Sequence, residues 1–307
     1  MGGSIINIDI TPPILTSQHC YWRFCDIKNH DHLSRICNQF NPTHVFHLAA
    51  KANLEGKRIE DYPDNVIGTA NVIKIVNSAS SLKRFVYMST QYVVRPGVHP
   101  PDETFLLPYT AYGASKALTE KLVRNQCNKN WIILRPTNIW GPLHPFFPGE
   151  LWPYIQKRYY LHPGYKPIVK YYGYVENAVQ QIITIGINTL AEDVHRRVFY
   201  ITDAPIDNFE WFNGFSLSLS KKPVRRIPIV LWKYCAAIGD IMRRISMPFP
   251  MTTERLFRLT INESVLYEKT LSLVGKPSIC LHEGIQRSVE WYQSKTSDKA
   301  EKGASIN

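Results

Sequence analysis

A tyrosine and a lysine stand four residues apart in the segment Tyr112-Gly113-Ala114-Ser115-Lys116. Residues 111–125 are predicted to form a helix, and side chains at positions i and i+4 lie on one face of a helix. A neighbouring ammonium group stabilises a phenolate and lowers the pKa of a tyrosine from its reference value near 10. Tyr112 is therefore a candidate acid/base for interconverting an alcohol and a carbonyl.

Two hydroxyl side chains follow a predicted strand upstream of this helix. The run Arg84 to Ser89 reads as a buried strand, and its end carries Ser89 and Thr90. Ligands bind at the carboxyl ends of the strands in open α/β sheets. The sequence therefore places these two hydroxyls at a ligand-binding edge.

The elements that must position these residues alternate between short β-branched runs and helical stretches, which indicates a parallel α/β sheet. Strands are predicted at residues 4–10, 45–49, 84–89, 131–136 and 198–202. Helices are predicted at residues 31–40, 65–78, 111–125 and 175–190, with Asp31 as the cap of the first. Residues 142–168 are rich in proline and aromatic residues, as in an inserted cap, and residues 204–292 are mostly helical.

The composition excludes several classes of protein. Hydrophobic residues form 44% of the 307, which is too many for a disordered chain. No apolar run reaches the roughly 18 residues of a membrane span, and no secretory leader opens the chain. A soluble, cytoplasmic protein is expected. The net charge of +11 favours an anionic partner. Because no zinc-finger or RNA-binding signature accompanies it, neither a metal nor nucleic acid is predicted.

Six motifs occur in a fixed order that covers nearly the whole chain: HLAA (47–50), NVIGT (65–69), FVYMST (85–90), YGASK (112–116), LRPTNIWGP (134–142) and YGYVENAVQ (172–180). Together they resemble the extended short-chain dehydrogenase/reductase superfamily, in its NAD-dependent epimerase/dehydratase family. The segment at 199–215 and the helix predicted after it are similar to the later part of the 3β-hydroxysteroid dehydrogenase branch.

This resemblance implies a Rossmann-type, doubly wound parallel sheet with a smaller, mostly helical substrate-binding region. On that expectation, residues 1–142 and 172–203 form the NAD-binding domain. Residues 143–171 and 204–292 form the substrate-binding region, and residues 293–307 a disordered tail.

The resemblance also implies roles for single residues. Tyr112 becomes the catalytic acid/base, and Lys116 also holds the nicotinamide ribose. Thr90, or alternatively Ser89, orients the substrate hydroxyl. Asn65 supports the helix geometry behind the site, and Asn138 contacts the substrate. Cofactor contacts are further expected from Leu48, Ala49, Ala50 and Pro136.

The adenosine side of the cofactor site is expected at Asp9, which closes a predicted strand. A carboxylate at this place accepts hydrogen bonds from the adenosine ribose. Asp26 and Ile27 resemble the pair that flanks the adenine ring. In the family, a strand and a G-x-x-G-x-x-G turn stand about 20 residues before the acidic residue. Asp9 is only nine residues from the start, so this strand and turn are expected to be missing, through an upstream start or through loss.

Three functions stay open at this stage. The first is an NAD-dependent epimerase, dehydratase or oxidoreductase acting on a nucleotide-linked sugar, which the positive charge and Asn138 favour. The second is a 3β-hydroxysteroid or sterol dehydrogenase, although Lys233, Asp240 and Arg243 break the apolar run that such members carry there. The third is a non-catalytic NAD-binding protein. The resemblance also implies a homodimer.

We expect NAD(H) to bind more tightly than NADP(H). The carboxylate of Asp9 would face the additional 2′-phosphate of NADP at close range, and like charges there reduce affinity. Isothermal titration calorimetry with both dinucleotides measures the difference. Equal affinities would contradict the role given to Asp9.

Overall fold

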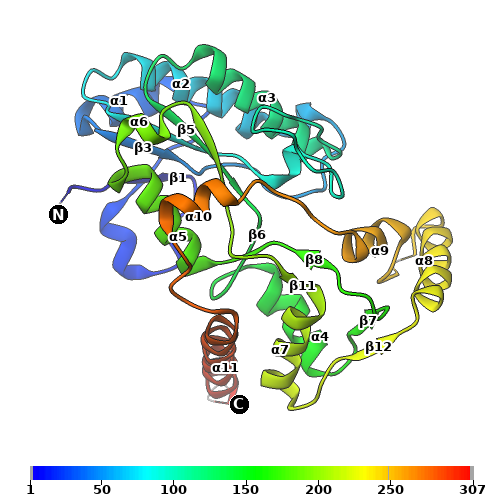
Figure 1. Ribbon diagram of the computed structural model, residues 1–307. Helices are drawn as coiled ribbons and strands as arrows, with labels where there is room; N and C mark the ends of the chain where they lie inside the picture. The colour runs from blue at the N-terminus through cyan, green and yellow to red at the C-terminus, as the bar shows by residue number, and fades with distance from the viewer. Residues whose placement is uncertain (1–2, 248, 305–307) are drawn as a thin grey trace.

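The computed structural model describes residues 3–247 and 249–304 (Figure 1). Its central sheet has four parallel strands in the order β10 (Arg197–Ile201), β5 (Trp131–Pro136), β4 (Arg84–Met88) and β3 (His44–His47). The helices on one face are α1 (His30–Phe40), α2 (Thr69–Ser78) and α3 (Ala111–Gln126). The other face is covered by α5 (Val175–Ile183), the π-helical turn η6 (Thr184–Asn188), α6 (Ala191–Val194) and α10 (Glu268–Val274).

Side chains of each central strand alternate between two hydrophobic cores. On β4, Phe85 and Tyr87 point into the core under α1 to α3, whereas Val86 points into the core under α5 and η6. On β5, Ile133 points into the first of these cores and Ile132 into the second. This alternation follows from the two-residue period of a strand, and both faces are apolar because both are covered by helices. The predicted doubly wound α/β fold is confirmed.

The strand that carries Asp9 belongs to a separate small sheet. Strand β1 (Asn7–Asp9) pairs in parallel with β2 (Trp22–Phe24), and the 3₁₀ turn η1 (Thr16–Tyr21) joins them. Within the described residues, no ladder connects this pair to β3. In the strand order of a doubly wound dinucleotide fold, one further strand stands between these two positions. Among the residues that the structure describes, no strand occupies that position.

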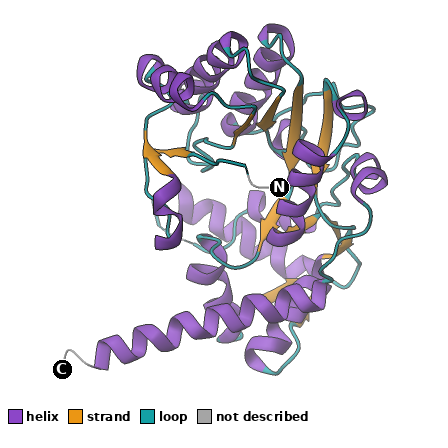
Figure 2. Cartoon of the chain, turned by 90° about the vertical axis from the view of Figure 1, so that its left-hand side faces the viewer, coloured by secondary structure: helices purple, strands orange, loops and turns teal. Residues whose placement is uncertain are grey.

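The remaining elements form the lower part of the molecule in Figure 1. Its aromatic core gathers Trp140, Trp152, Trp211 and Phe215. These side chains come from β6 (Asn138–Trp140), α4 (Trp152–Gln156) and α7 (Asn208–Ser220), and α11 (Leu281–Ala304) closes the core from below. Figure 2 shows α11 extending along the base of the molecule.

Short strand pairs and turns complete the fold. The pairs are β6 with β9 (Tyr172–Tyr174), β7 (Leu161–Pro163) with β12 (Arg225–Ile227), and β8 (Val169–Lys170) with β11 (Ile206–Asp207). Helices α8 (Ile229–Arg244) and α9 (Thr253–Thr260) pack on each other. The turns are η2 (Ile59–Asp61), η3 (Asp64–Gly68), η4 (Gln91–Val93) and η5 (Phe147–Leu151).

Three of the differences from the sequence prediction have a plain physical reason. Strand β1 is shorter than 4–10, because it has only the three residues of β2 to pair with. The cap of α1 is Asn29 and not Asp31, since the Asn29 side chain accepts a hydrogen bond from the backbone N–H of His32. Helix α11 continues to Ala304 through a segment rich in good helix formers, where a disordered tail was expected from residue 293. Residues 305–307 of that tail lie outside the described residues.

A glycine lets α3 approach the turn after β4. A Cβ atom at Gly113 would lie 2.3 Å from the carbonyl oxygen of Tyr92 and 3.1 Å from the hydroxyl of Thr110. Because the first of these atoms belongs to the backbone, a side chain could be accommodated only if α3 moved away from η4. This close approach brings the start of α3, with Tyr112, against the segment that follows Thr90.

We expect Gly113→Ala to lower the free energy of unfolding by about 1–3 kcal/mol, the usual cost of overpacking. Gly149→Ala is the matched control, because nothing lies within 4 Å of a Cβ atom at Gly149. Thermal and urea denaturation of the two variants measure the effect. Equal stabilities of both variants and the parent protein would show that α3 has freedom to move.

Candidate active site

Helix α3 presents the two predicted catalytic residues to the sheet. Its first turn is capped by Thr110, whose hydroxyl accepts a hydrogen bond of 2.9 Å from the backbone N–H of Gly113. Tyr112 is 8% exposed and Lys116 is 2% exposed, so both side chains lie on the inner face of the helix. The shared face predicted from their spacing is therefore present in the fold.

The hydroxyl of Tyr112 meets Thr90 at the end of β4. The interaction with the Thr90 side chain lowers the pKa of Tyr112, but burial outweighs it and raises that pKa to about 12. The rings of Tyr62 and Tyr92 lie 5.9 Å and 6.3 Å from the ring of Tyr112, measured between centroids. Tyr112 therefore holds its proton firmly in an aromatic surrounding.

Lys116 lies against the sheet and not against the phenol of Tyr112. Its ammonium sits 4.5 Å from the ring centroid of Tyr87, a cation–π distance. Burial lowers the pKa of Lys116 to about 7, and the negative charge of Glu120 acts in the opposite direction. The expectation that Lys116 depresses the pKa of Tyr112 is therefore not met in this structure, because burial dominates for both groups.

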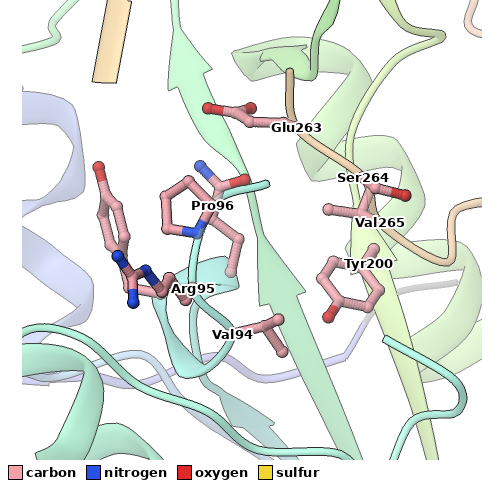
Figure 3. A pocket seen from close by; sticks show the side chains of 9 residues that line it. Val94, Arg95, Pro96, Tyr200, Glu263, Ser264 and Val265 are labelled. Atoms are coloured by element: carbon pink, nitrogen blue, oxygen red, sulfur yellow. The ribbon is translucent and has the colours of Figure 1, made fainter. Parts of the chain in front are cut away.

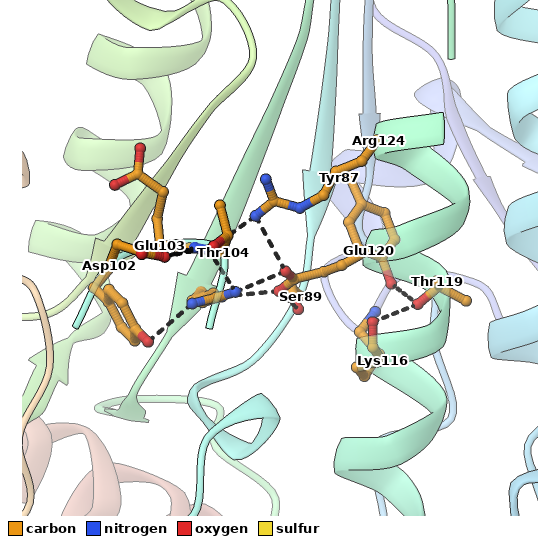
Figure 4. Close-up of polar contacts among 11 residues, drawn as sticks. Tyr87, Ser89, Asp102, Glu103, Thr104, Lys116, Thr119, Glu120 and Arg124 are labelled. Carbon is orange, nitrogen blue, oxygen red and sulfur yellow. Dashed lines mark hydrogen bonds and ion pairs between the residues drawn. The ribbon is translucent and has the colours of Figure 1, made fainter. Parts of the chain in front are cut away.

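A buried ion pair stands behind these residues (Figure 4). Glu120 lies one turn after Lys116 on α3 and is 0% exposed, as is Arg135 on β5. Two parallel hydrogen bonds join them, from Arg135 Nε to Glu120 Oε1 at 2.9 Å and from Arg135 Nη2 to Glu120 Oε2 at 2.8 Å. Ser89 donates to Glu120 Oε1 at 2.6 Å, and Arg135 Nη1 donates to the hydroxyl of Tyr200 at 3.1 Å.

This network separates the roles of the two hydroxyl residues after β4. The hydroxyl of Ser89 donates to Glu120, whereas the hydroxyl of Thr90 accepts a hydrogen bond of 3.3 Å from the backbone N–H of Tyr92 and interacts with Tyr112. Of the two predicted alternatives, Thr90 is therefore the one beside Tyr112.

Asn65 links the loop after β3 to helix α3 through side-chain hydrogen bonds. Its side-chain amide donates to the hydroxyl of Ser115 at 3.0 Å and to the carbonyl of Lys51 at 3.1 Å. Its carbonyl oxygen accepts from the backbone N–H of Lys51 at 2.8 Å. The predicted supporting role of Asn65 has a direct geometric counterpart in these bonds.

The residues predicted to contact the cofactor lie at the ends of successive strands. Leu48, Ala49 and Ala50 follow β3 directly, and Pro136 is the last residue of β5. Parallel strands bring these ends to one edge, where Thr90 also lies. Asn138 begins β6, two residues after Pro136.

Asp9 and Asp26 lie at the ends of the separate strand pair. Asp9 accepts a hydrogen bond from the backbone N–H of Thr11 at 2.8 Å, which aims its carboxylate beyond the end of β1. Asp26 follows β2 and forms an ion pair of 3.5 Å with Lys28. Ile27 packs into the core under α1 and α2. Carboxylate acceptors at one end and a buried ammonium and phenol at the other fit the two ribose ends of a dinucleotide.

A small open pocket of about 20 Å³, room for about one water molecule, lies beside the Tyr112 region (Figure 3). Two of its lining residues, Gln91 and Tyr92, directly follow Thr90. Its opposite wall comes from the segment after α9, with Glu263, Ser264 and Val265. Tyr200, the partner of Arg135, also lines it, so the buried network reaches the pocket wall.

Sequence reasoning missed the ion pair and the tyrosines around Tyr112. Two signals in the sequence could have indicated the pair. Glu120 continues the spacing of Tyr112 and Lys116 by four residues, and Arg135 interrupts an otherwise apolar strand, WIILRP. A charged residue in a strand that is buried on both faces requires a partner. Tyr62 and Tyr92 lie in separate segments of the chain, so no pattern in the sequence predicts that they meet Tyr112.

The sequence is similar to a known protein family and to several characterised enzymes. The model of the NAD-dependent epimerase/dehydratase family matches residues 10–183. A 3β-hydroxysteroid dehydrogenase/decarboxylase (isoform 1) of Arabidopsis thaliana is 26% identical over 275 residues, which is 80% of this chain and 61% of that protein. A 2-alkyl-3-oxoalkanoate reductase of Stenotrophomonas maltophilia is 37% identical over 110 residues, 32% of each chain.

Solved structures share the fold. The UDP-glucose 4-epimerase of Thermotoga maritima, solved with UDP-glucose, superimposes with a TM-score of 0.71 at 18% identity, covering 96% of this chain and 92% of that one. The chain thus spans nearly all of this structural neighbour but less than two thirds of the two sequence relatives. Within the described part of the chain, no helix is long and apolar enough to cross a membrane.

The lowered pKa of Lys116 predicts a pH-dependent stability. A folded-state pKa of about 7 lies below the ordinary value of about 10.4 in an unfolded chain. Between these values the unfolded state binds more protons, so this group makes the protein more stable as the pH rises. Lys116→Met removes the cost of burying the charge. It should raise the melting temperature most near pH 6 and progressively less toward about pH 10.

Thermal denaturation across this pH range measures the effect. Lys121→Met is the matched control, because Lys121 lies on the same helix but is exposed. A melting-temperature difference between Lys116→Met and the parent protein that did not vary with pH would contradict the assigned pKa.

Proposed function

The chain belongs to the NAD-dependent epimerase/dehydratase family, and on this premise we propose that it moves a hydride between NAD and a carbon carrying a hydroxyl or keto group. The expectation of NAD is confirmed at the level of the family. The observation that best supports the proposal is that Tyr112 lies beside Thr90 at the strand edge, with Lys116 on the same buried face of the helix.

In this mechanism the protein controls one proton. Bound NAD supplies the hydride chemistry. Thr90 and Tyr112 hold the substrate oxygen between their hydroxyls, and Tyr112 receives or returns its proton as the carbon is oxidised or reduced. Lys116, when protonated, would favour the phenolate on Tyr112 through its charge alone, since its ammonium lies over the Tyr87 ring and not against the phenol. It would also contact the nicotinamide ribose. Leu48, Ala49, Ala50 and Pro136 would line the nicotinamide side, and Asp9, Asp26 and Ile27 the adenosine side.

For the substrate, we place an uncharged alcohol or ketone of the hydroxysteroid type first. Two observations favour this class over a nucleotide diphosphate. Next to Tyr112 the surroundings are aromatic, from Tyr62 and Tyr92. The charged groups that line the adjoining pocket are one arginine, Arg95, and one carboxylate, Glu263, which is already paired with Lys170 at 3.0 Å. Two relatives that align with 80% and 84% of this chain are both hydroxysteroid dehydrogenase/decarboxylases.

A nucleotide-linked sugar is the second candidate. The net charge of +11 and the position of Asn138 two residues past β5 favour it, and the structural neighbour from Thermotoga maritima was solved with UDP-glucose. For either class, we propose that residues 143–171 and 204–292 form the substrate-binding region. A homodimer and a cytoplasmic location stay predictions.

We expect Tyr112→Phe to lower turnover by about 10²- to 10⁴-fold, the contribution of a general acid/base. The change removes one hydroxyl and almost no volume, so the melting temperature should stay close to that of the parent protein. Turnover is followed as NADH absorbance with a 3β-hydroxysterol. With UDP-glucose it is followed as chromatographic conversion of the sugar nucleotide, because epimerisation or dehydration returns the hydride to the sugar and leaves no net NADH. Tyr159→Phe is the control, because that side chain is exposed.

The two substrates decide between the candidates. Turnover of the sterol alone supports the first class, and turnover of UDP-glucose alone supports the second. A Tyr112→Phe variant that keeps most of its turnover on the accepted substrate would refute the role of Tyr112. Binding of NAD without turnover of either substrate would favour the non-catalytic alternative.

A further inference from the structure

The ammonium of Lys116 rests on the face of one aromatic ring. Its Nζ atom lies 4.5 Å from the ring centroid of Tyr87 on β4, which is within the range of a cation–π contact. Tyr87 is fully buried and Lys116 almost so, and water therefore screens this contact little. A buried ammonium requires a compensating partner, and the negative face of the ring supplies one.

The hydroxyl of Tyr87 fixes the ring relative to the helix. It is hydrogen-bonded with the hydroxyl of Thr119 on α3 (Figure 4). The Thr119 hydroxyl donates to the carbonyl of Lys116 at 2.9 Å and to that of Ser115 at 3.1 Å. Because a threonine hydroxyl has only one hydrogen, Tyr87 is the donor in its bond with Thr119. The ring and the ammonium are thus held by the same turn of α3.

The neighbouring strand supports the ring from another side. The ring of His47 on β3 lies 5.7 Å from that of Tyr87, measured between centroids, and its Nε2 atom is 2.9 Å from the hydroxyl of Thr69. Packing alone does not explain a hydroxyl at this position. Phe85, two residues earlier on the same face of β4, fills the same core with an unsubstituted ring.

We propose that Tyr87 is a positioning residue for Lys116. The face of its ring holds the ammonium against β4, and this placement sets the position from which Lys116 contacts the nicotinamide ribose. A protonated lysine carries three N–H donors, so those directed away from the ring stay available for ribose hydroxyls. The inference rests on the proposed function because it requires bound NAD, and it adds a residue that does not touch the reacting atoms.

The ionisable groups around Lys116 come from three further positions in the fold. Burial lowers the pKa of His47 on β3 to about 3 and raises that of Tyr112 on α3 to about 12. Glu120, also on α3, is held in its ion pair with Arg135 on β5. A change between pH 6 and pH 9 in the coupling of Tyr87 to Lys116 therefore reports on the charge of Lys116, whose pKa is about 7.

The test compares three substitutions that differ in what they remove. Tyr87→Met removes the ring and keeps most of the volume, whereas Tyr87→Phe keeps the ring and removes the hydroxyl. Phe85→Met is the matched control, because Phe85 is equally buried in the same core and on the same strand face. Each is combined with Lys116→Met, so that double-mutant cycles isolate the part of each effect that acts through Lys116.

Urea denaturation measures the coupling without any need for cofactor. At pH 6, where the folded protein carries a charged Lys116, we expect the cycle of Tyr87→Met with Lys116→Met to give a coupling of about two- to thirtyfold in the unfolding equilibrium constant. At pH 9, where this group is neutral in the folded state, the coupling should fall. The cycle with Phe85→Met should show no coupling at either pH.

Calorimetry with NAD at pH 6 then tests the placement toward the ribose. Tyr87→Met should weaken binding by about two- to tenfold, the net contribution of one hydrogen bond. It should cause no further loss in the Lys116→Met background. Tyr87→Phe and Phe85→Met should stay close to the parent affinity. Circular dichroism verifies the fold, and if Tyr87→Met does not fold, Tyr87→pentafluorophenylalanine keeps the shape of the ring while removing the negative charge of its face.

The other outcomes overturn the proposal. Coupling of the same size at pH 6 and pH 9, or for Phe85→Met, would reduce Tyr87 to a packing residue. A loss of NAD affinity that persisted in the Lys116→Met background would show that the ring does not act through Lys116. A parent protein that bound no NAD would instead contradict the proposed function, and with it the part of this proposal that concerns the ribose.

Discussion

The ion pair between Glu120 and Arg135 is the interaction on which the site depends. Both side chains are fully buried, and removing charges from water costs several kcal/mol for each ion. The two parallel hydrogen bonds, with further bonds to Ser89 and Tyr200, offset that cost because the carboxylate and guanidinium are matched in geometry. Removing either partner would leave an unpaired buried charge, which typically costs about 3–5 kcal/mol.

This pair connects four elements that would otherwise be joined only by apolar packing. Glu120 belongs to α3, Ser89 follows β4, Arg135 belongs to β5, and Tyr200 belongs to β10. Apolar contacts tolerate small shifts, whereas a bidentate ion pair allows one register. Since Tyr112 and Lys116 stand on the same face of α3 as Glu120, holding that face in register with β4 also sets the distance from Tyr112 to Thr90. The close approach of Gly113 to Tyr92 restrains the same helix at its start.

Two parts of the molecule carry interaction chemistry beyond this centre. The strand pair β1 and β2 holds Asp9 and Asp26, the carboxylates proposed for the adenosine side, in a sheet separate from the main one. At the other end, α8 combines a well-packed inner face with an apolar outer face. The segment after α9, which packs on α8, forms one wall of the pocket beside Tyr92.

The sequence by itself determined the fold class, the central strands and the catalytic candidates, because these are encoded by local patterns. The apolar runs at residues 84–89 and 131–136 and the four-residue spacing of Tyr112 and Lys116 are visible in the sequence without any knowledge of distant contacts. Only the tertiary structure decided that Thr90 and not Ser89 meets Tyr112, that burial raises the pKa of Tyr112 and lowers that of Lys116, and that α8 is apolar on its outer face. Each of these depends on which segments, far apart in the chain, surround a side chain, and spacing along the sequence does not carry that information.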